Sequence, residues 1–96
     1  MLDIVKLALR ITTQSFDNEL NMLIQACLEE MQGLGVIVVL DEGLPSSVQV
    51  QSAVIAYCKW LFGQNEDADR WRDIYHTKLA QLKTMTGHTD WGGVNG

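Results

Sequence analysis

The segment Val48–Gly63, VQVQSAVIAYCKWLFG, limits the possible folds of this chain more than any other stretch. One set of apolar residues recurs there at helical spacing: Val50, Val54, Tyr57 and Leu61. A second set fills most of the remaining circumference: Ala53, Ile55, Ala56, Cys58, Trp60 and Phe62. A helix that is apolar on nearly every side is usually covered on nearly every side. We therefore expect it at the centre of a small helical domain, packed by the other helices or also by a neighbouring subunit.

A chain of 96 residues is long enough for one domain, because a domain with a single hydrophobic core typically has about 50–200 residues. Twelve acidic residues against seven lysines and arginines give a formal net charge of -5. Affinity for nucleic acid rests on cationic contacts to phosphate, so this balance argues against direct nucleic-acid recognition. A basic group near the C-terminus is interpreted as a solvated helix face, with a phosphate site as the alternative: Arg70, Arg72, Lys78 and Lys83.

A short amphipathic helix is predicted over Leu2–Ile11, with its apolar residues on one side and Lys6 and Arg10 on the other. A turn-forming run, Thr12–Ser15, follows, because such side chains compete for backbone hydrogen bonds. A helix of about ten residues is marginal alone in water. This one must therefore dock on the rest of the domain.

The clearest amphipathic pattern comes after this turn. Apolar residues recur there at spacings of three and four: Leu20, Leu23, Ile24, Cys27, Leu28 and Met31. We expect Ser15 or Asp17 to cap this helix at its start. Gly33 and Gly35 end it, because glycine accepts the left-handed conformation common just past a helix C-terminus.

An apolar, β-branched run separates this helix from the central one. Residues 35–40 read Gly-Val-Ile-Val-Val-Leu, a composition that favours extended backbone. Asp41–Gly43 predicts a turn. We interpret residues 34–46 as an ordered loop with strand-like character, whose edge, if exposed, is able to pair with another chain. Ser46 or Ser47 then caps the central helix.

The last helix is predicted to begin near Glu66 and to run to about Met85. Its buried stripe consists of Ala68, Trp71, Tyr75, Leu79 and Leu82, with Ile74 and Lys78 at the margins. After Thr86 the sequence is glycine-rich and has no apolar period, so we expect a helical domain over 1–86 and a flexible tail over 87–96. The predicted fold is all-α: a small bundle of four helices around the central apolar helix, with an extended loop between the second and third.

No spacing in the chain matches a catalytic, cofactor or metal motif. His76, His88 and Asp90 are separated by a helix end and do not converge as zinc ligands. Cys27 and Cys58 fall on apolar faces, where buried thiols are normally inert even if His76 approaches them. We expect no enzymatic activity, no cofactor and no metal. Two free thiols also suit a reducing compartment.

No apolar run approaches the roughly 20 residues that span a bilayer, and the N-terminus lacks a secretory pattern. We therefore expect a soluble protein. Its candidate functional residues are those with apolar surface available for a partner.

The strand-like run contributes most of these candidates: Val36, Ile37, Val38, Val39 and Leu40. Trp60 lies on the crowded central helix, where a core position is the simpler interpretation and an interface position the alternative. Trp91 stands in the glycine-rich tail with no local core to join. It either docks on a partner or makes no contact, and large aromatic residues are favoured anchors at interfaces.

Three groups of residues follow the short leading helix in a characteristic order along the sequence. The first group is Glu19-Leu20, Leu23-Ile24, Ala26, Gly33 and Gly35-Val36. The second is Ala53-Val54, Tyr57-Cys58-Lys59 and Phe62-Gly63, and the third is Ala68-Asp69-Arg70-Trp71, Tyr75 and Leu79. Over about residues 2–85 this pattern resembles the head–tail connector, or adaptor, proteins of tailed bacteriophages and prophages.

The resemblance implies a structural virion protein whose subunits join in a ring of about a dozen copies beneath the portal protein at the capsid vertex. DNA passes through such a ring without specific recognition, and the tail or a stopper protein docks below it. In the family an inter-helix loop and the C-terminal segment contact neighbours or the portal, roles that fall here to Gly35–Leu44 and Thr84–Gly96. Assembly is expected in the bacterial host cytoplasm, and the final location is the head–tail interface of the virion.

The residues alone also fit a second class of function. A monomeric or dimeric helical module that holds a partner helix in a groove shows the same amphipathic patterns. Ring assembly separates the two hypotheses, because only the connector requires it.

Overall fold

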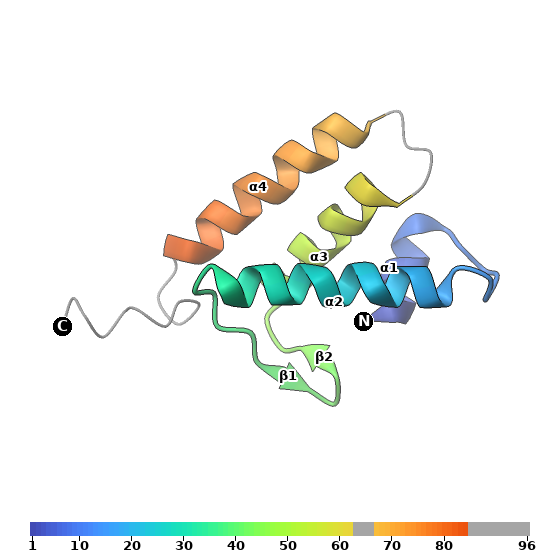
Figure 1. The fold of residues 1–96 in the computed structure, drawn as a ribbon, viewed down its shortest axis with the longest axis horizontal. Coiled ribbons are helices and arrows are strands. Elements are labelled where there is room, and N and C mark those ends of the chain that lie inside the picture. Colours follow the sequence, from blue (N-terminus) through green and yellow to red (C-terminus); the bar gives the residue numbers. More distant parts are fainter. Residues whose placement is uncertain (63–66, 85–96) are drawn as a thin grey trace.

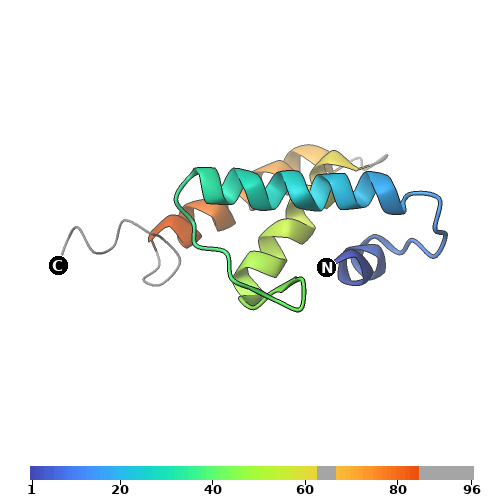
Figure 2. The same cartoon turned by 60° about the horizontal axis from the view of Figure 1, so that its bottom comes forward.

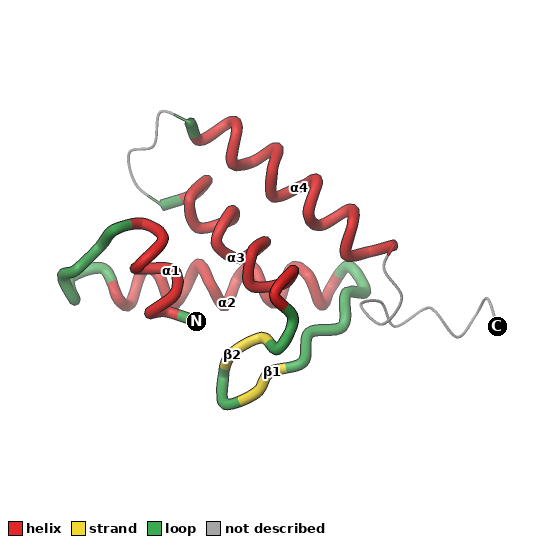
Figure 3. The backbone as a smooth tube through the Cα atoms, turned by 180° about the vertical axis from the view of Figure 1, so that it is seen from behind, coloured by secondary structure: helices red, strands yellow, loops and turns green. Residues whose placement is uncertain are grey.

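Helix α3 (Val48–Leu61) is the central element, and the other three helices pack against it. The computed structural model describes residues 1–62 and 67–84. Helix α4 (Ala68–Thr84) lies alongside α3, and α2 (Asp17–Gly33) crosses in front of α3 in Figure 1 and behind it in Figure 3. The predicted all-α fold is confirmed, with a short β-hairpin as an addition.

Helix α1 (Leu2–Leu9) ends two residues before its predicted end, in a Schellman motif. The amide of Ile11 donates to the carbonyl of Lys6 at 2.9 Å, and the amide of Arg10 donates to that of Leu7 at 3.2 Å. Arg10 takes the left-handed conformation that this motif requires, with φ of 59°. Arginine does not usually signal the end of a helix, so this boundary was not indicated by the sequence.

The contact between α1 and α2 corrects two expectations. Lys6 does not face outward: its Nζ lies 2.7 Å from Asp17 Oδ1, and its side chain is 15% exposed. A lysine stem covers apolar surface while its charged end reaches a carboxylate. Neither Ser15 nor Asp17 caps α2: Asp17 is the first helical residue and its carboxylate accepts from Lys6, while Ser15 Oγ accepts from Thr13 Oγ1 at 3.0 Å. Phe16 occupies the cap position without a side-chain hydrogen bond.

Helix α2 ends as the glycines predict. The amide of Val36 donates to the carbonyl of Met31 at 3.0 Å, and the amide of Gly35 donates to that of Gln32 at 3.1 Å. Gly35 supplies the left-handed residue between them, with φ of 90°. This second Schellman motif brings Val36 back into the core beside Met31, where both are buried.

The loop between α2 and α3 folds into an antiparallel hairpin of β1 (Leu40–Asp41) and β2 (Leu44–Pro45). Its turn consists of Glu42 and Gly43, whose φ angles of 53° and 81° are those of a type I′ turn. The hairpin projects from the body on the side away from α4 (Figures 1 and 3), and Figure 2 shows α3 descending from α2 toward it. The strand-like character predicted for residues 34–46 is therefore confirmed, and the two strands pair with each other.

Helix α3 begins at a cap predicted from the sequence: the Val50 amide donates to Ser47 Oγ at 3.3 Å. The predicted stripes of α2, α3 and α4 supply most of the single hydrophobic core. Two predicted stripe residues lie outside it: Leu61 is 43% exposed at the end of α3, and Ala68 is half-buried at the start of α4. The largest buried side chain, Tyr75, donates its hydroxyl to Glu30 Oε1 at 2.7 Å and so links α4 to α2. The boundary predicted between a domain over 1–86 and a tail over 87–96 lies outside the described residues.

The two buried thiols predict a loss of stability at alkaline pH. Burial raises the pKa of Cys27 and of Cys58 from 9.0 to about 12. Their contribution to stability is therefore complete below pH 9.0 and is lost as pH rises toward 12, because the unfolded thiols ionise first. Each thiol contributes a slope of at most about 1.4 kcal/mol per pH unit. Urea unfolding should give a lower free energy of unfolding at about pH 10 than at about pH 8.

The control for this prediction is the double variant Cys27→Ala, Cys58→Ala, which removes both titrating groups. Its free energy of unfolding should fall less between the same two pH values, whatever its absolute stability. An equally steep fall in the variant would show that the thiols do not cause the pH dependence.

Two glycines form a matched pair of stability predictions. A Cβ added at Gly33 or at Gly43 meets no atom within 4 Å, so backbone conformation alone decides the effect. Gly43→Ala should cost about 1 kcal/mol, because φ of 81° is unfavourable for a residue with a Cβ. Gly33→Ala should instead stabilise the last turn of α2 by up to about 1 kcal/mol. Thermal unfolding should show Tm shifts of opposite sign, and shifts of the same sign would contradict the turn geometry.

Candidate functional site

The five residues of the predicted interaction run do not share one environment. Extended backbone turns successive side chains to opposite sides. Val36 is buried and Val38 is half-buried against the core. Ile37, Val39 and Leu40 are 38%, 59% and 50% exposed. The structure thus divides the run into two residues that anchor it and three that are available to a partner.

The hairpin is held firmly on the first turns of α3. The amide of Ser46 donates to the carbonyl of Val39 at 2.9 Å, and Gln51 Nε2 donates to the carbonyl of Pro45 at 2.7 Å. Pro45 itself is buried, so the base of the hairpin belongs to the core. A projection that is already ordered loses little conformational freedom when it binds.

The turn of the hairpin adds negative charge to this apolar projection. Asp41 and Glu42 are exposed, and neither carboxylate makes a hydrogen bond or ion pair with another residue in the described ranges. We define the hairpin surface as Ile37, Val39, Leu40, Asp41 and Glu42. It suits a partner that is partly apolar and positively charged.

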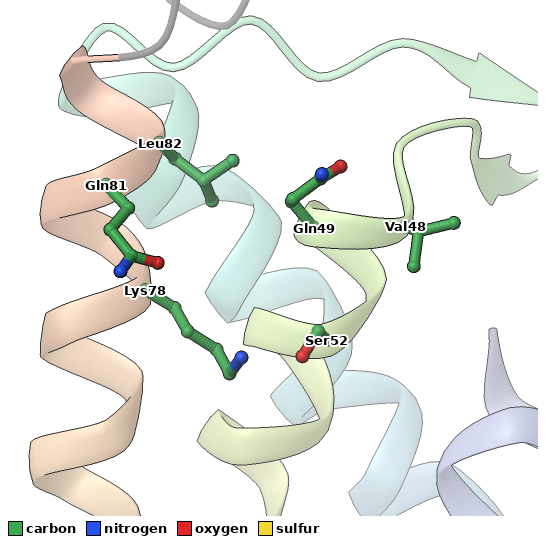
Figure 4. Close-up of a pocket in the computed structure, with 6 residues that line it drawn as sticks. All are labelled: Val48, Gln49, Ser52, Lys78, Gln81 and Leu82. Carbon is green, nitrogen blue, oxygen red and sulfur yellow. The ribbon is translucent and has the colours of Figure 1, made fainter.

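A second feature is a groove between α3 and α4. Figure 4 shows its residues, which enclose a hollow of about 190 Å³: Val48, Gln49, Ser52, Lys78, Gln81 and Leu82. The side chain of Lys78 extends from α4 toward Ser52 on α3 (Figure 4). A shallower hollow of about 420 Å³ on α4 shares Lys78 and Gln81 and adds Arg70, Asp73, Ile74 and Thr77. We refer to the first set of six residues as the α3–α4 groove.

The groove and the adjoining hollow on α4 carry two cations without an ion-pair partner in the described ranges. Lys78 is half-buried and Arg70 is exposed, and neither forms an ion pair with a described residue. Arg72 differs, because it lies 3.5 Å from Asp69 and 3.4 Å from Asp73. The interpretation of this basic group as a solvated helix face did not separate Arg72, which has ion-pair partners, from Lys78 and Arg70, which have none among the described residues. The available signal was the marginal position of Lys78 beside the buried stripe.

Of the two candidate tryptophans, Trp60 and Trp91, the structure describes only Trp60. Trp60 is half-buried in an aromatic cluster, with ring centroids 5.8 Å from Tyr57, 6.0 Å from Tyr75 and 5.5 Å from His76. These contacts tie α3 to α4, and a role for Trp60 at an interface stays a prediction. Trp91 lies outside the described residues.

The side chains of Cys27 and Tyr75, which could in principle be reactive, pack between α2 and α4. Cys27 Sγ lies 4.0 Å from the Tyr75 hydroxyl, and burial raises the pKa of that hydroxyl, as does its hydrogen bond to Glu30. With its own pKa raised to about 12, the Cys27 thiol stays protonated at neutral pH and is a poor nucleophile. Among the described residues, no three His, Cys, Asp or Glu side chains form a cluster suited to a metal ion. None of the helices in these ranges is long and apolar enough to cross a membrane.

The comparison with protein families agrees with the pattern of helices and motifs. The model of the phage connector protein family matches residues 1–89. No curated protein and no solved structure matches the chain significantly. Because the family match covers most of the sequence, the chain belongs to the phage connector proteins, structural components of the bacteriophage head–tail connector.

Proposed function

We propose that this protein forms a ring of about a dozen copies that joins the portal vertex to the tail and lets DNA pass. The observation that carries the proposal is the family match over residues 1–89. Its partners are further copies of the chain, the portal protein, and a tail or stopper protein. Its place is the head–tail interface of the virion, after assembly in the cytoplasm of the bacterial host.

The form of the domain supports assembly into a ring. Rings are built by heterologous contacts, in which one surface of a subunit meets a different surface of the next. The hairpin projects from one side of the body and α4 forms the other (Figure 1). A net charge of -5 also disfavours tight binding of DNA as it passes.

The candidate residues take different parts in this proposal. Exposed Ile37, Val39 and Leu40 supply contact surface, while Val36 and Val38 hold the segment in place. Trp60 is a second candidate, because it is only partly buried where α3 meets α4. Trp91 remains a predicted anchor on a partner.

Electron microscopy provides the direct test. Negatively stained preparations of the concentrated protein, alone and mixed with isolated portal rings, should show free rings or portals with an added layer. The same protein mixed with an unrelated ring-shaped complex is the control. A compact monomer that decorates no portal and binds a peptide in a discrete groove would contradict the connector and favour the binding module.

Trp60→Ala separates the core role of this residue from an interface role. The half-buried ring loses its contacts with Tyr57, Tyr75 and His76, so unfolding should become easier by about 2 kcal/mol, below the ~3–5 typical of fully buried aromatic residues. Chemical denaturation measures this loss, and sedimentation of the folded fraction measures assembly. A folded variant that no longer assembles supports the interface role, whereas a folded variant that assembles normally confines Trp60 to the core.

A further inference from the structure

The geometry points to a specific contact between neighbouring copies: the hairpin surface of one subunit enters the α3–α4 groove of the next. This inference rests on the proposed ring and names the two surfaces that close it. The carboxylates of Asp41 and Glu42 meet Lys78 and Arg70, and Leu40 or Val39 enters the hollow beside Val48 and Leu82.

Charge complementarity carries the first step. The hairpin presents two exposed carboxylates, Asp41 and Glu42, without partners in the described part of the chain. Lys78 in the groove and Arg70 in the adjoining hollow on α4 also have no ion-pair partner there, while Asp73 of that hollow lies beside Arg72. Elsewhere Lys6 is neutralised by Asp17, and Arg72 lies beside two aspartates. The charges left unpaired on these two features are opposite in sign.

The apolar groups carry the second step. Val39 and Leu40 are 59% and 50% exposed on the hairpin, and Val48 at the rim of the groove is 71% exposed. Leu82 forms the buried floor of the hollow, whose volume of about 190 Å³ admits an aliphatic side chain. Joining these surfaces removes apolar area from water on both copies.

The placement of the two surfaces carries the third step. Both are attached to the beginning of α3, but the hairpin leaves it in one direction and α4 lies in the other (Figures 1 and 4). A subunit cannot fill its own groove with a hairpin fastened by the Gln51–Pro45 and Ser46–Val39 hydrogen bonds. A second copy can, and the contact then repeats from subunit to subunit.

Charge reversal with rescue tests the contact. Lys78→Glu should weaken self-association by about a hundredfold, and the pair Asp41→Lys, Glu42→Lys should do the same, because each places like charges opposite each other. Combining all three substitutions in one chain should restore association to within about tenfold of the wild type. Lys83→Glu makes the same charge change on α4 outside the groove and should leave association unchanged. Analytical ultracentrifugation measures association, and circular dichroism confirms that each variant is folded.

Disulfide trapping keeps the test independent of any loss of folding. Leu40→Cys combined with Ser52→Cys should give a ladder of covalent oligomers on a non-reducing gel, since Cys27 and Cys58 are buried. Either substitution alone should give no species larger than a dimer, because each chain then carries one accessible thiol. A double variant that also stops at the dimer overturns the head-to-tail contact between successive copies.

The outcomes distinguish this contact from the ring itself. Rings or decorated portals that form equally well in every charge variant overturn the contact and leave the connector function standing. Lys78→Glu that reduces portal decoration without affecting self-association assigns the groove to the portal and also overturns the contact. Wild-type protein that neither self-associates nor decorates portals overturns both proposals.

Discussion

The burial of α3 on several sides governs how everything else in this small domain is arranged. Helices α1, α2 and α4 each pack against it, and each contributes mainly one apolar stripe to the shared core. Their remaining faces are therefore free to carry polar and charged groups. Because the hairpin is fastened to the first turns of α3 and the groove uses the same turns as one wall, both surfaces are held in a fixed relation to each other.

Two polar contacts, one near each end of α2, connect this helix to α1 and to α4. At one end Lys6 of α1 meets Asp17, and toward the other end the Tyr75 hydroxyl of α4 donates to Glu30. A buried hydroxyl without a partner would cost about 1–3 kcal/mol, so the Tyr75–Glu30 bond favours one relative position of α4 and α2. A groove lined by residues of α3 and α4 needs such fixed helix positions if its shape is to be constant.

Local patterns in the sequence predicted most of the fold. The predictions that failed were those that depend on contacts between elements. Periodicity was sufficient to locate the stripes of α2 and α4, and Gly35 was sufficient to end α2. Lys6 was misplaced because its partner lies 11 residues away on another helix, which no periodicity indicates. The exposure of Leu61 has the same origin, since the pattern of α3 does not reveal where its neighbours end.

The candidate site was predictable in part. The β-branched run identified the segment that projects, but the alternation between buried Val36 and exposed Ile37 depends on how α2 ends and the hairpin begins. The α3–α4 groove could not be found from sequence, because Ser52 and Lys78 come together only when two helices pack.

The distribution of unpaired charge bears on which assemblies of this chain are favourable. A contact that pairs the same surface of two copies would bring Asp41 and Glu42 of one hairpin against those of another, or Lys78 against Lys78. Either arrangement places like charges together, which opposes association. A hairpin that faces a groove pairs Asp41 and Glu42 with Lys78, and when this contact runs in one direction it leaves one free hairpin and one free groove on every dimer. In the proposed ring such a dimer is incomplete, and copies add until the last groove meets the first hairpin. Charge therefore disfavours hairpin-to-hairpin and groove-to-groove pairs, and the direction of the hairpin-to-groove contact decides between the proposed closed ring and a dimer that exchanges two hairpins.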